Sequence, residues 1–261
     1  MDKIRELLWI GINAVQAVFL AVWSALWITV ALLSLGVTLS RRPGLWLARR
    51  AWSPGLLAIG PARLDVEGLD RLDPSRACFF VSNHQSWIDI PALFTAIPIP
   101  LLFVAKRELG RVPFLGWYMA AMGMVLIDRS DRAKSAASIA RVAERLRQGW
   151  SVLTFPEGSR SRDGTVQSFK PAAFAAAIDA AAPVVPVAIS GAGRVLPRDG
   201  FRPRPGTIRV RVGEPIPTAG LTRHDRGDLA RRVQQEVEAL LTEPSLTEAS
   251  CQSSPLSAAN R

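Results

Sequence analysis

An uncharged apolar stretch near the start of the chain limits its fold more than any other feature. No Asp, Glu, Lys or Arg occurs between Leu7 and Ser40, whereas roughly 20 apolar residues already cross a bilayer as a helix. A secretory signal would have an apolar core of only about 7 to 15 residues, followed by a small-residue cleavage site. The stretch therefore predicts a membrane segment. It fits one long helix or a two-helix hairpin broken near residues 11–16 or at Gly36, and hydropathy does not separate the two.

Basic residues flank this segment unevenly. It is followed directly by Arg41, Arg42, Arg49 and Arg50, whereas the two basic residues before it are matched by two acidic ones. Loops rich in Lys and Arg stay on the cytoplasmic side of a membrane. We therefore expect the protein at the inner (cytoplasmic) membrane, with the rest of the chain on the cytoplasmic side.

The formal net charge of the whole chain is +10. Nucleic acid is the usual first partner considered for a basic protein. Beside a membrane segment, however, anionic headgroups attract each nearby Lys or Arg by about 1 kcal/mol. We therefore expect an anionic membrane surface and phosphorylated or acidic substrates as partners, and no nucleic acid.

Cysteine and histidine are too sparse to indicate a metal site or a disulfide framework. Cys78 lies in an apolar run and Cys251 in a polar tail, and the only histidines are His84 and His224. His224 stands in a charged linker and reads as a surface residue. We therefore predict no metal ligands and no cofactor.

After the apolar segment, short runs typical of strands alternate with helical patterns. Strands are predicted at 64–67, 78–82, 101–105, 124–127, 152–155 and 184–189, and helices at 135–148 and 174–181. This alternation favours an α/β fold, a layered mixed sheet with flanking helices, preceded by the membrane helix or hairpin.

The last third of the chain adds a strand, a helix and a tail to this predicted order. Ile208, Val210 and Val212 alternate with two arginines, a pattern typical of a half-exposed strand, which we place at the edge of the sheet. An amphipathic helix follows at 229–241, and then a Ser-rich tail without periodicity, for which disorder is expected. The predicted division is a membrane-anchoring segment at 1–58, an α/β domain at 59–242 and a tail at 243–261.

The chemistry is predicted in the turn that follows the strand at 78–82, where α/β sheets bind ligands. His84 and Asp89 are five residues apart, which on one helix would place them about 140° apart. They meet only if His84 lies in the loop and Asp89 in the first helical turn, a start that Pro91 favours. The carboxylate then orients the imidazole as a general base toward a hydroxyl. The alternative is a capping box of Ser86 and Asp89 beside an unrelated loop histidine.

A wider pattern supports the catalytic interpretation. Asn83, His84 and Asp89, spaced as N-H-x-x-x-x-D, resemble the first signature motif of the glycerolipid acyltransferase family, which includes lysophosphatidic acid acyltransferases. Three further blocks in the same order resemble later motifs: Gly123 with Leu126, Ile127 and Arg129; 155–161; and 185–187 with Gly191. Ser159 stands where threonine is common, and Leu126 where phenylalanine is frequent. The resemblance covers about residues 77–191.

The resemblance implies transfer of a fatty acyl group from acyl-CoA or an acyl-carrier protein to a lysophospholipid, with phosphatidic acid as product. His84 would be the general base and Asp89 its orienting partner, without a covalent intermediate, because Ser159 lacks the flanks of a nucleophile elbow. Arg129, at the end of a strand, would bind the acceptor phosphate. The other residues expected at the substrate are Lys106, Glu157, Gly158, Ser159 and Arg160.

Purely structural alternatives remain for these residues. For Arg129 the alternative is a surface ion pair with Asp128 or Asp131, and for the loop at 158–164 it is a simple turn. Glu157 would hold either the hydroxyls of the acceptor or the arginines. Among functions, the alternatives are an acyltransferase for another lyso-lipid such as lyso-ornithine lipid, a metal-dependent phosphohydrolase, and a non-catalytic membrane scaffold.

Overall fold

In the computed structural model, residues 2–128, 131–198 and 200–243 are described. They contain one seven-stranded sheet in the spatial order β1-β7-β6-β2-β5-β3-β4. The strands are β1 (Ala62–Glu67), β2 (Phe79–Ser82), β3 (Leu101–Lys106), β4 (Val125–Ile127), β5 (Ser151–Thr154), β6 (Val184–Ser190) and β7 (Gly206–Val212). Neighbouring strands are parallel except β6 and β7, which are antiparallel. The predicted mixed α/β sheet is confirmed.

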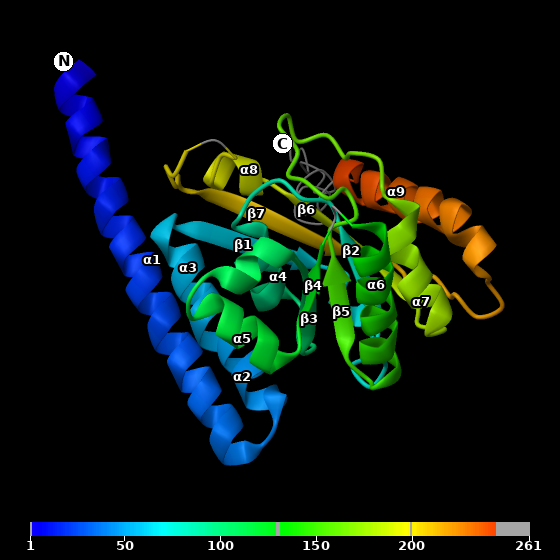
Figure 1. Cartoon of the computed structure of the whole chain (residues 1–261). Helices are drawn as coiled ribbons and strands as arrows, with labels where there is room; N and C mark the ends of the chain where they lie inside the picture. The colour runs from blue at the N-terminus through cyan, green and yellow to red at the C-terminus, as the bar shows by residue number, and fades with distance from the viewer. Residues whose placement is uncertain (1, 129–130, 199, 244–261) are drawn as a thin grey trace, which may run out of the picture.

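Helices cover both faces of this sheet (Figure 1). The helices are α1 (Asp2–Thr38), α2 (Arg41–Leu47), α3 (Ser53–Ile59), α4 (Asp89–Ala96), α5 (Leu115–Met122), α6 (Arg132–Arg147), α7 (Ala175–Asp179), α8 (Ala192–Val195) and α9 (Arg226–Thr242). Helices α6, α7 and α9 lie on one side, and the N-terminal helices with α4 and α5 lie on the other (Figure 1).

The central strand β2 shows why the sheet is buried on both faces. Phe79, Phe80 and Val81 are each at most 1% exposed, and such continuous apolar runs are typical of parallel strands covered by helices. β2 lies between β5 and β6. The carboxyl ends of β2, β5, β3 and β4 therefore meet along one edge of the sheet.

The N-terminal segment is one long helix against which the chain folds back. The described residues include one stretch, Leu8–Thr38 in α1, that is long and apolar enough to cross a membrane. After α1 the chain returns as α2, a π-helical turn and α3. Gly55 of α3 lies against the Trp23 ring, where a Cβ atom would be 2.4 Å from ring carbons. Trp23 Nε1 donates to the carbonyl of Trp52 at 3.0 Å, and Trp52 Nε1 donates to Ser24 Oγ at 3.0 Å.

The predicted edge position of the strand at 208–212 is wrong. β7 lies between β1 and β6, and the edge strands are β1 and β4. Arg211 is 7% exposed, pairs with Glu67 at 2.9 Å and donates to two carbonyls at the end of α9. Its charge is buried because these partners, distant in sequence, surround it. The tail residues 244–261, for which disorder was expected, lie outside the described residues, and the proposed domain division stays a prediction.

Candidate active site

His84 and Asp89 are in direct contact in the loop between β2 and α4. Asp89 is the first residue of α4 and is fully buried. Its Oδ2 atom lies 2.7 Å from Nδ1 of His84 and also accepts the backbone N–H groups of Gln85, at 2.7 Å, and Ser86, at 2.8 Å. The His84 side chain is 14% exposed. The structure thus brings together the two residues that the sequence singled out as catalytic.

The hydrogen bonds around Asp89 indicate which imidazole nitrogen carries the proton. A carboxylate oxygen only accepts hydrogen bonds, and Oδ2 already accepts two from the backbone. Nδ1 of His84 is therefore assigned as the donor, which leaves the lone pair on Nε2. Asp89 thus binds both the Ser86 N–H and the imidazole. The Ser86–Asp89 capping box is only half formed, because the N-cap of α4 is Ile88 without a side-chain cap hydrogen bond and Ser86 Oγ donates to Leu196.

The histidine loop is clamped by neighbouring segments. The carboxamide of Asn83 donates to the carbonyl of Ile189 at 2.9 Å and accepts its N–H at 2.8 Å. Ser86 Oγ donates to the carbonyl of Leu196 at 2.6 Å, and the carbonyl of His84 accepts the N–H of Ser161 at 2.8 Å. Asn83 of the first motif therefore ties the loop to β6.

Two residues just beyond β5 contact His84. The Phe155 ring stacks on the imidazole with centroids 4.0 Å apart, and Oε1 of the buried Glu157 accepts the His84 backbone N–H at 2.9 Å. Burial raises the Glu157 pKa to about 7; the Asp89 charge adds to this, whereas backbone N–H groups of His84 and Gln167 oppose it. We did not predict the stacking of Phe155 from the sequence, because no local pattern shows that β5 lies next to β2.

The predicted basic residues lie at different places along this edge. Lys106 is exposed at the end of β3, with Nζ 3.4 Å from Glu108. The Arg160 guanidinium lies 4.9 Å from the centroid of the Trp87 ring and donates to the carbonyl of Arg198 at 3.1 Å. Arg129 lies outside the described residues. Arg198, which in turn donates to the carbonyl of Arg160, has no sequence signal that would have marked it.

The loop at 158–164 uses several of its backbone N–H groups internally. Gly158, with φ of 80°, donates to the carbonyl of Phe155 at 3.1 Å, as in a turn. Ser159 is exposed, and its hydroxyl lies 3.2 Å from Gln167 Oε1. The N–H of Gly164 donates to Ser161 Oγ at 3.0 Å. These groups shape the loop that supports His84, which gives weight to the turn interpretation for this segment.

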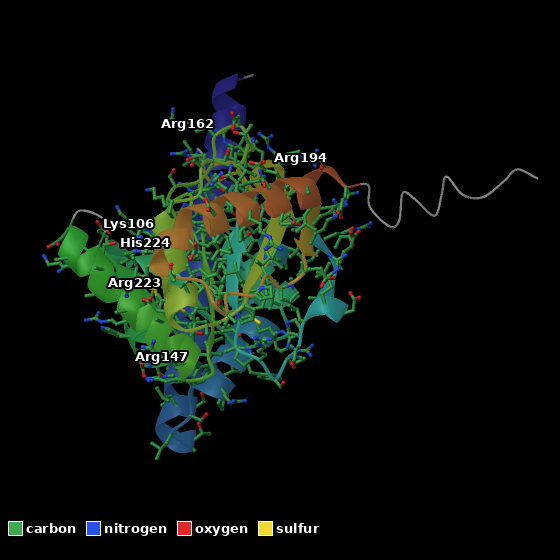
Figure 2. The ribbon with its side chains drawn as sticks, turned by 90° about the vertical axis from the view of Figure 1, so that its right-hand side faces the viewer. Lys106, Arg147, Arg162, Arg194, Arg223 and His224 are labelled. Carbon is green, nitrogen blue, oxygen red and sulfur yellow. The ribbon has the colours of Figure 1, made fainter. Side chains whose placement is uncertain are left out.

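His224 lies away from this site. It is exposed in the 3-10 turn Arg223–Asp225 that precedes α9, and Figure 2 shows it apart from Arg162 of the 158–164 loop. Its neighbour Arg223 pairs with Asp179 at the end of α7, just before the amino end of β6, whereas His84 follows the carboxyl end of β2. Within the described ranges, no three His, Cys, Asp or Glu side chains come together as metal ligands, so the phosphohydrolase alternative gains no support.

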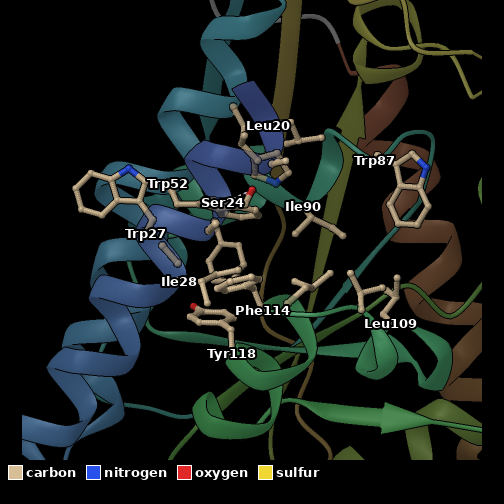
Figure 3. A pocket seen from close by; sticks show the side chains of 18 of the residues that line it. Leu20, Ser24, Trp27, Ile28, Trp52, Trp87, Ile90, Leu109, Phe114 and Tyr118 are labelled. Carbon is tan, nitrogen blue, oxygen red and sulfur yellow. Dashed lines mark hydrogen bonds between the residues drawn. The ribbon is translucent and has the colours of Figure 1, made fainter. Parts of the chain in front are cut away.

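An apolar cavity of about 700 Å³ opens beside the histidine loop. Figure 3 shows it between α1, which contributes Leu20 and Ile28, and the side chains of Ile90 and Tyr118. Trp87 and Ile88, which follow His84 closely in the chain, also line it. Phe103 joins the two regions, since it lines the cavity and packs on Phe155 with centroids 6.5 Å apart. The imidazole therefore lies next to a space suited to an alkyl chain.

Comparison with known proteins agrees with the motif resemblance. Residues 63–190 match a family model described as acyltransferase. A 1-acyl-sn-glycerol-3-phosphate acyltransferase of Pseudomonas aeruginosa is 33% identical over 77% of this chain and 75% of its own length. A chloroplastic enzyme of the same name from Brassica napus is 36% identical over 59% of this chain, and this chain spans less than half, 45%, of that relative.

A solved structure resembles the whole described fold. The crystal structure of the 1-acyl-sn-glycerophosphate (LPA) acyltransferase PlsC from Thermotoga maritima has a TM-score of 0.76 and 26% identity, and the match covers 94% of this chain and all of that one. Together with the Pseudomonas relative, this agreement in sequence and fold shows the family. The chain belongs to the acyltransferase family that contains the 1-acyl-sn-glycerol-3-phosphate acyltransferases.

Proposed function

We propose that this protein transfers a fatty acyl group from a thioester donor, acyl-CoA or acyl-carrier protein, to the sn-2 hydroxyl of 1-acyl-glycerol-3-phosphate, giving phosphatidic acid. The names of the family members cited above support the acceptor. The observation that carries the proposal is the His84–Asp89 contact of 2.7 Å at the edge of an apolar cavity. It combines a base for a hydroxyl with a space for its alkyl chain.

In the proposed reaction, Nε2 of His84 accepts the proton of the acceptor hydroxyl while its oxygen attacks the thioester carbonyl carbon. The C–S bond then breaks, the ester forms, and the imidazolium returns its proton to the leaving thiolate. Asp89 keeps the imidazole in the required tautomer and stabilises the imidazolium through Nδ1. The acyl group passes directly between substrates, so no covalent enzyme intermediate forms.

The acceptor phosphate requires fixed cations near the strand ends. We propose Arg129, Lys106 and Arg160 for this role; in the sequence Arg129 comes two residues after the end of β4, and Lys106 is the last residue of β3. Arginine suits phosphate because its planar fork donates two parallel hydrogen bonds. The third-motif residues Glu157, Gly158 and Ser159 form the loop against which the acceptor would lie.

The apolar surfaces support a membrane location for the reaction. We propose that α1 anchors the enzyme at the cytoplasmic membrane with the active site on the cytoplasmic side, where the basic residues after α1 meet anionic headgroups. An acyl chain of a lipid substrate would occupy the cavity between α1 and α5.

The test is transfer of a labelled acyl group from a thioester to lysophosphatidic acid, measured for wild type, His84→Ala and His224→Ala. Loss of the base lowers turnover by roughly 10³-fold, whereas His224→Ala, which alters the other histidine of the chain, leaves turnover unchanged. Near-normal turnover in a folded His84→Ala enzyme contradicts the mechanism.

Two further arms of this assay test the acceptor. Arg129→Ala is expected to raise KM for lysophosphatidic acid with a smaller change in kcat, because phosphate binding is lost. Lyso-ornithine lipid, assayed in parallel, distinguishes a phosphate-bearing acceptor from a lyso-lipid without that group. Better use of the ornithine lipid than of lysophosphatidic acid contradicts the proposed acceptor.

A further inference from the structure

The short helix α5 exposes apolar side chains on the face turned away from the core. Its sequence, Leu115–Met122, contains no charged residue. Tyr118, Met119 and Met122 are buried, yet Trp117 on the outer face is 59% exposed. A helix that is apolar all round is normally covered on every side, by protein or by lipid.

The turn before α5 holds a second aromatic ring outward. Phe114 has φ of 61° and ψ of −56°, and the N–H of Leu115 donates to the carbonyl of Pro113 at 2.7 Å. This is a γ-turn with positive φ, which is rare and strained for a residue with a side chain. Phe114 is 42% exposed, and its ring lies 5.1 Å from that of Trp117. Backbone strain and an exposed ring occur together here, so the fold supports a display of apolar surface.

This surface adjoins the membrane segment. Helix α5 contacts α1 and lies beside it in Figure 1. The outer side of α1 carries exposed apolar residues, among them Leu26 at 51% and Leu33 at 65%. Phe114 also lines the apolar cavity. The apolar patch formed by Phe114 and Trp117 therefore adjoins both α1 and the cavity.

Exposed basic residues precede the patch. Lys106 and Arg111 lie in the segment that leads from β3 to α5. Apolar rings next to exposed cations match the order of a bilayer surface, where anionic headgroups border the acyl chains.

We propose that Phe114 and Trp117 form an aromatic wedge that inserts into the acyl layer of the leaflet contacted by α1. The partner is a lipid bilayer with anionic headgroups. The wedge gives the catalytic domain a second membrane contact beside α1 and keeps the cavity next to the acyl chains. The contact of the wedge with lipid does not depend on which reaction the enzyme catalyses. The idea that this contact helps a lipid substrate to enter the cavity rests on the proposed function.

A fluorescent label tests the lipid contact without turnover. Trp117→Cys, in a Cys251→Ser background, is labelled with a nitrobenzoxadiazole maleimide and reconstituted into phosphatidylcholine–phosphatidylglycerol vesicles. Cys78 does not compete, because it is buried and burial raises its thiol pKa to about 11. The matched control is Gln235→Cys on α9, which lies across the sheet (Figure 1) and is exposed.

Brominated acyl chains are expected to quench the label at position 117, and iodide dissolved in the water is not. For the label at position 235 we expect quenching by iodide and none by brominated chains. A label at 117 that iodide quenches and brominated chains do not overturns the proposal. So does a label protected from both quenchers, since that result means a protein partner covers the wedge.

An activity measurement separates membrane contact from a purely structural role. Trp117→Glu is expected to lower transfer to lysophosphatidic acid in vesicles by roughly tenfold, because a charge resists insertion, and to preserve transfer to a short-chain, monomeric lysophosphatidic acid. Trp117→Leu should act like wild type on both. Equal loss by Trp117→Glu on both substrates contradicts the wedge, whereas absence of any transfer by wild type would contradict the proposed function instead.

Discussion

The histidine loop and the apolar cavity lie side by side and are built in opposite ways. In the loop, one oxygen of Asp89 accepts three hydrogen bonds, and Asn83 is paired on both of its amide atoms. The cavity is lined mainly by Ala, Leu, Ile and aromatic side chains, which offer few directional contacts. The loop therefore fixes atoms in position, whereas the cavity offers space.

This difference separates two kinds of functional effect. A change in the loop alters the position or protonation of the imidazole and should lower kcat. A change in the cavity alters which alkyl chain fits and should change selectivity, with little effect on the chemical step. Three predictions follow, in order of the expected effect. The first and last test this division, and the second tests the burial of Glu157 beside the histidine loop.

The largest effect is expected for Asp89→Asn. An amide oxygen can take the place of Oδ2, but the neutral amide cannot stabilise the imidazolium, and its N–H₂ group then occupies the buried position of Oδ1. We expect kcat to fall by about 10³- to 10⁴-fold, measured by acyl transfer at saturating substrate. Thermal unfolding serves as the control for folding, and a kcat within tenfold of wild type in a folded variant would break the proposed role of Asp89.

A smaller effect is expected on the pH dependence of stability in Glu157→Gln. The folded-state pKa of Glu157 is raised from 4.5 to about 7, so between these values the native protein holds a proton that the unfolded chain releases. Stability contributed by this group therefore falls as pH rises through this window, by ~3 kcal/mol in total, and is constant above it. Glu157→Gln should flatten this slope.

The slope is measured by thermal unfolding in detergent at several pH values, with Glu236→Gln, an exposed residue of α9, as the matched control. If Glu157→Gln has the same pH slope of stability as the control and the wild type, burial does not raise the pKa of Glu157.

The smallest effect is expected in the cavity. Ala25 of α1 lines it, so Ala25→Phe should shorten the space and lower kcat/KM for the longest acyl chains by roughly 10- to 100-fold, with short chains little affected. Ala14→Phe, on an exposed part of the same helix, is the control. Equal loss for all chain lengths would mean that the cavity and the loop do not act separately.

The sequence predicted much of this arrangement, because local patterns carry it. The apolar stretch marked α1, and alternation of strand and helix marked the sheet. The distance of five residues between His84 and Asp89, with Pro91 beyond, placed one residue in a loop and the other in a first turn. The predicted helix at 174–181 is shorter, since 171–174 is a 3-10 turn and α7 spans only Ala175–Asp179.

Other features depend on strand order. The prediction of an edge strand for 208–212 failed because β7 pairs with β1, which lies far away in the sequence. Glu67 and Arg211, for example, are neighbours in the sheet although 144 positions separate them in the chain. The stacking of Phe155 on His84 requires β5 to lie beside β2, although β3 and β4 intervene in the chain. The alternation of polar and apolar side chains along a strand does not show which other strand lies next to it in the sheet.

By itself, the sequence determined the long apolar helix α1, the α/β class and the residues of the histidine motif, because helix periodicity, charge and capping act over a few residues. The tertiary structure alone decided the cavity, the burial of Arg211 and Glu157, and the exposed rings of α5. These depend on which distant segments exclude water from a given side chain, and only the folded chain determines that.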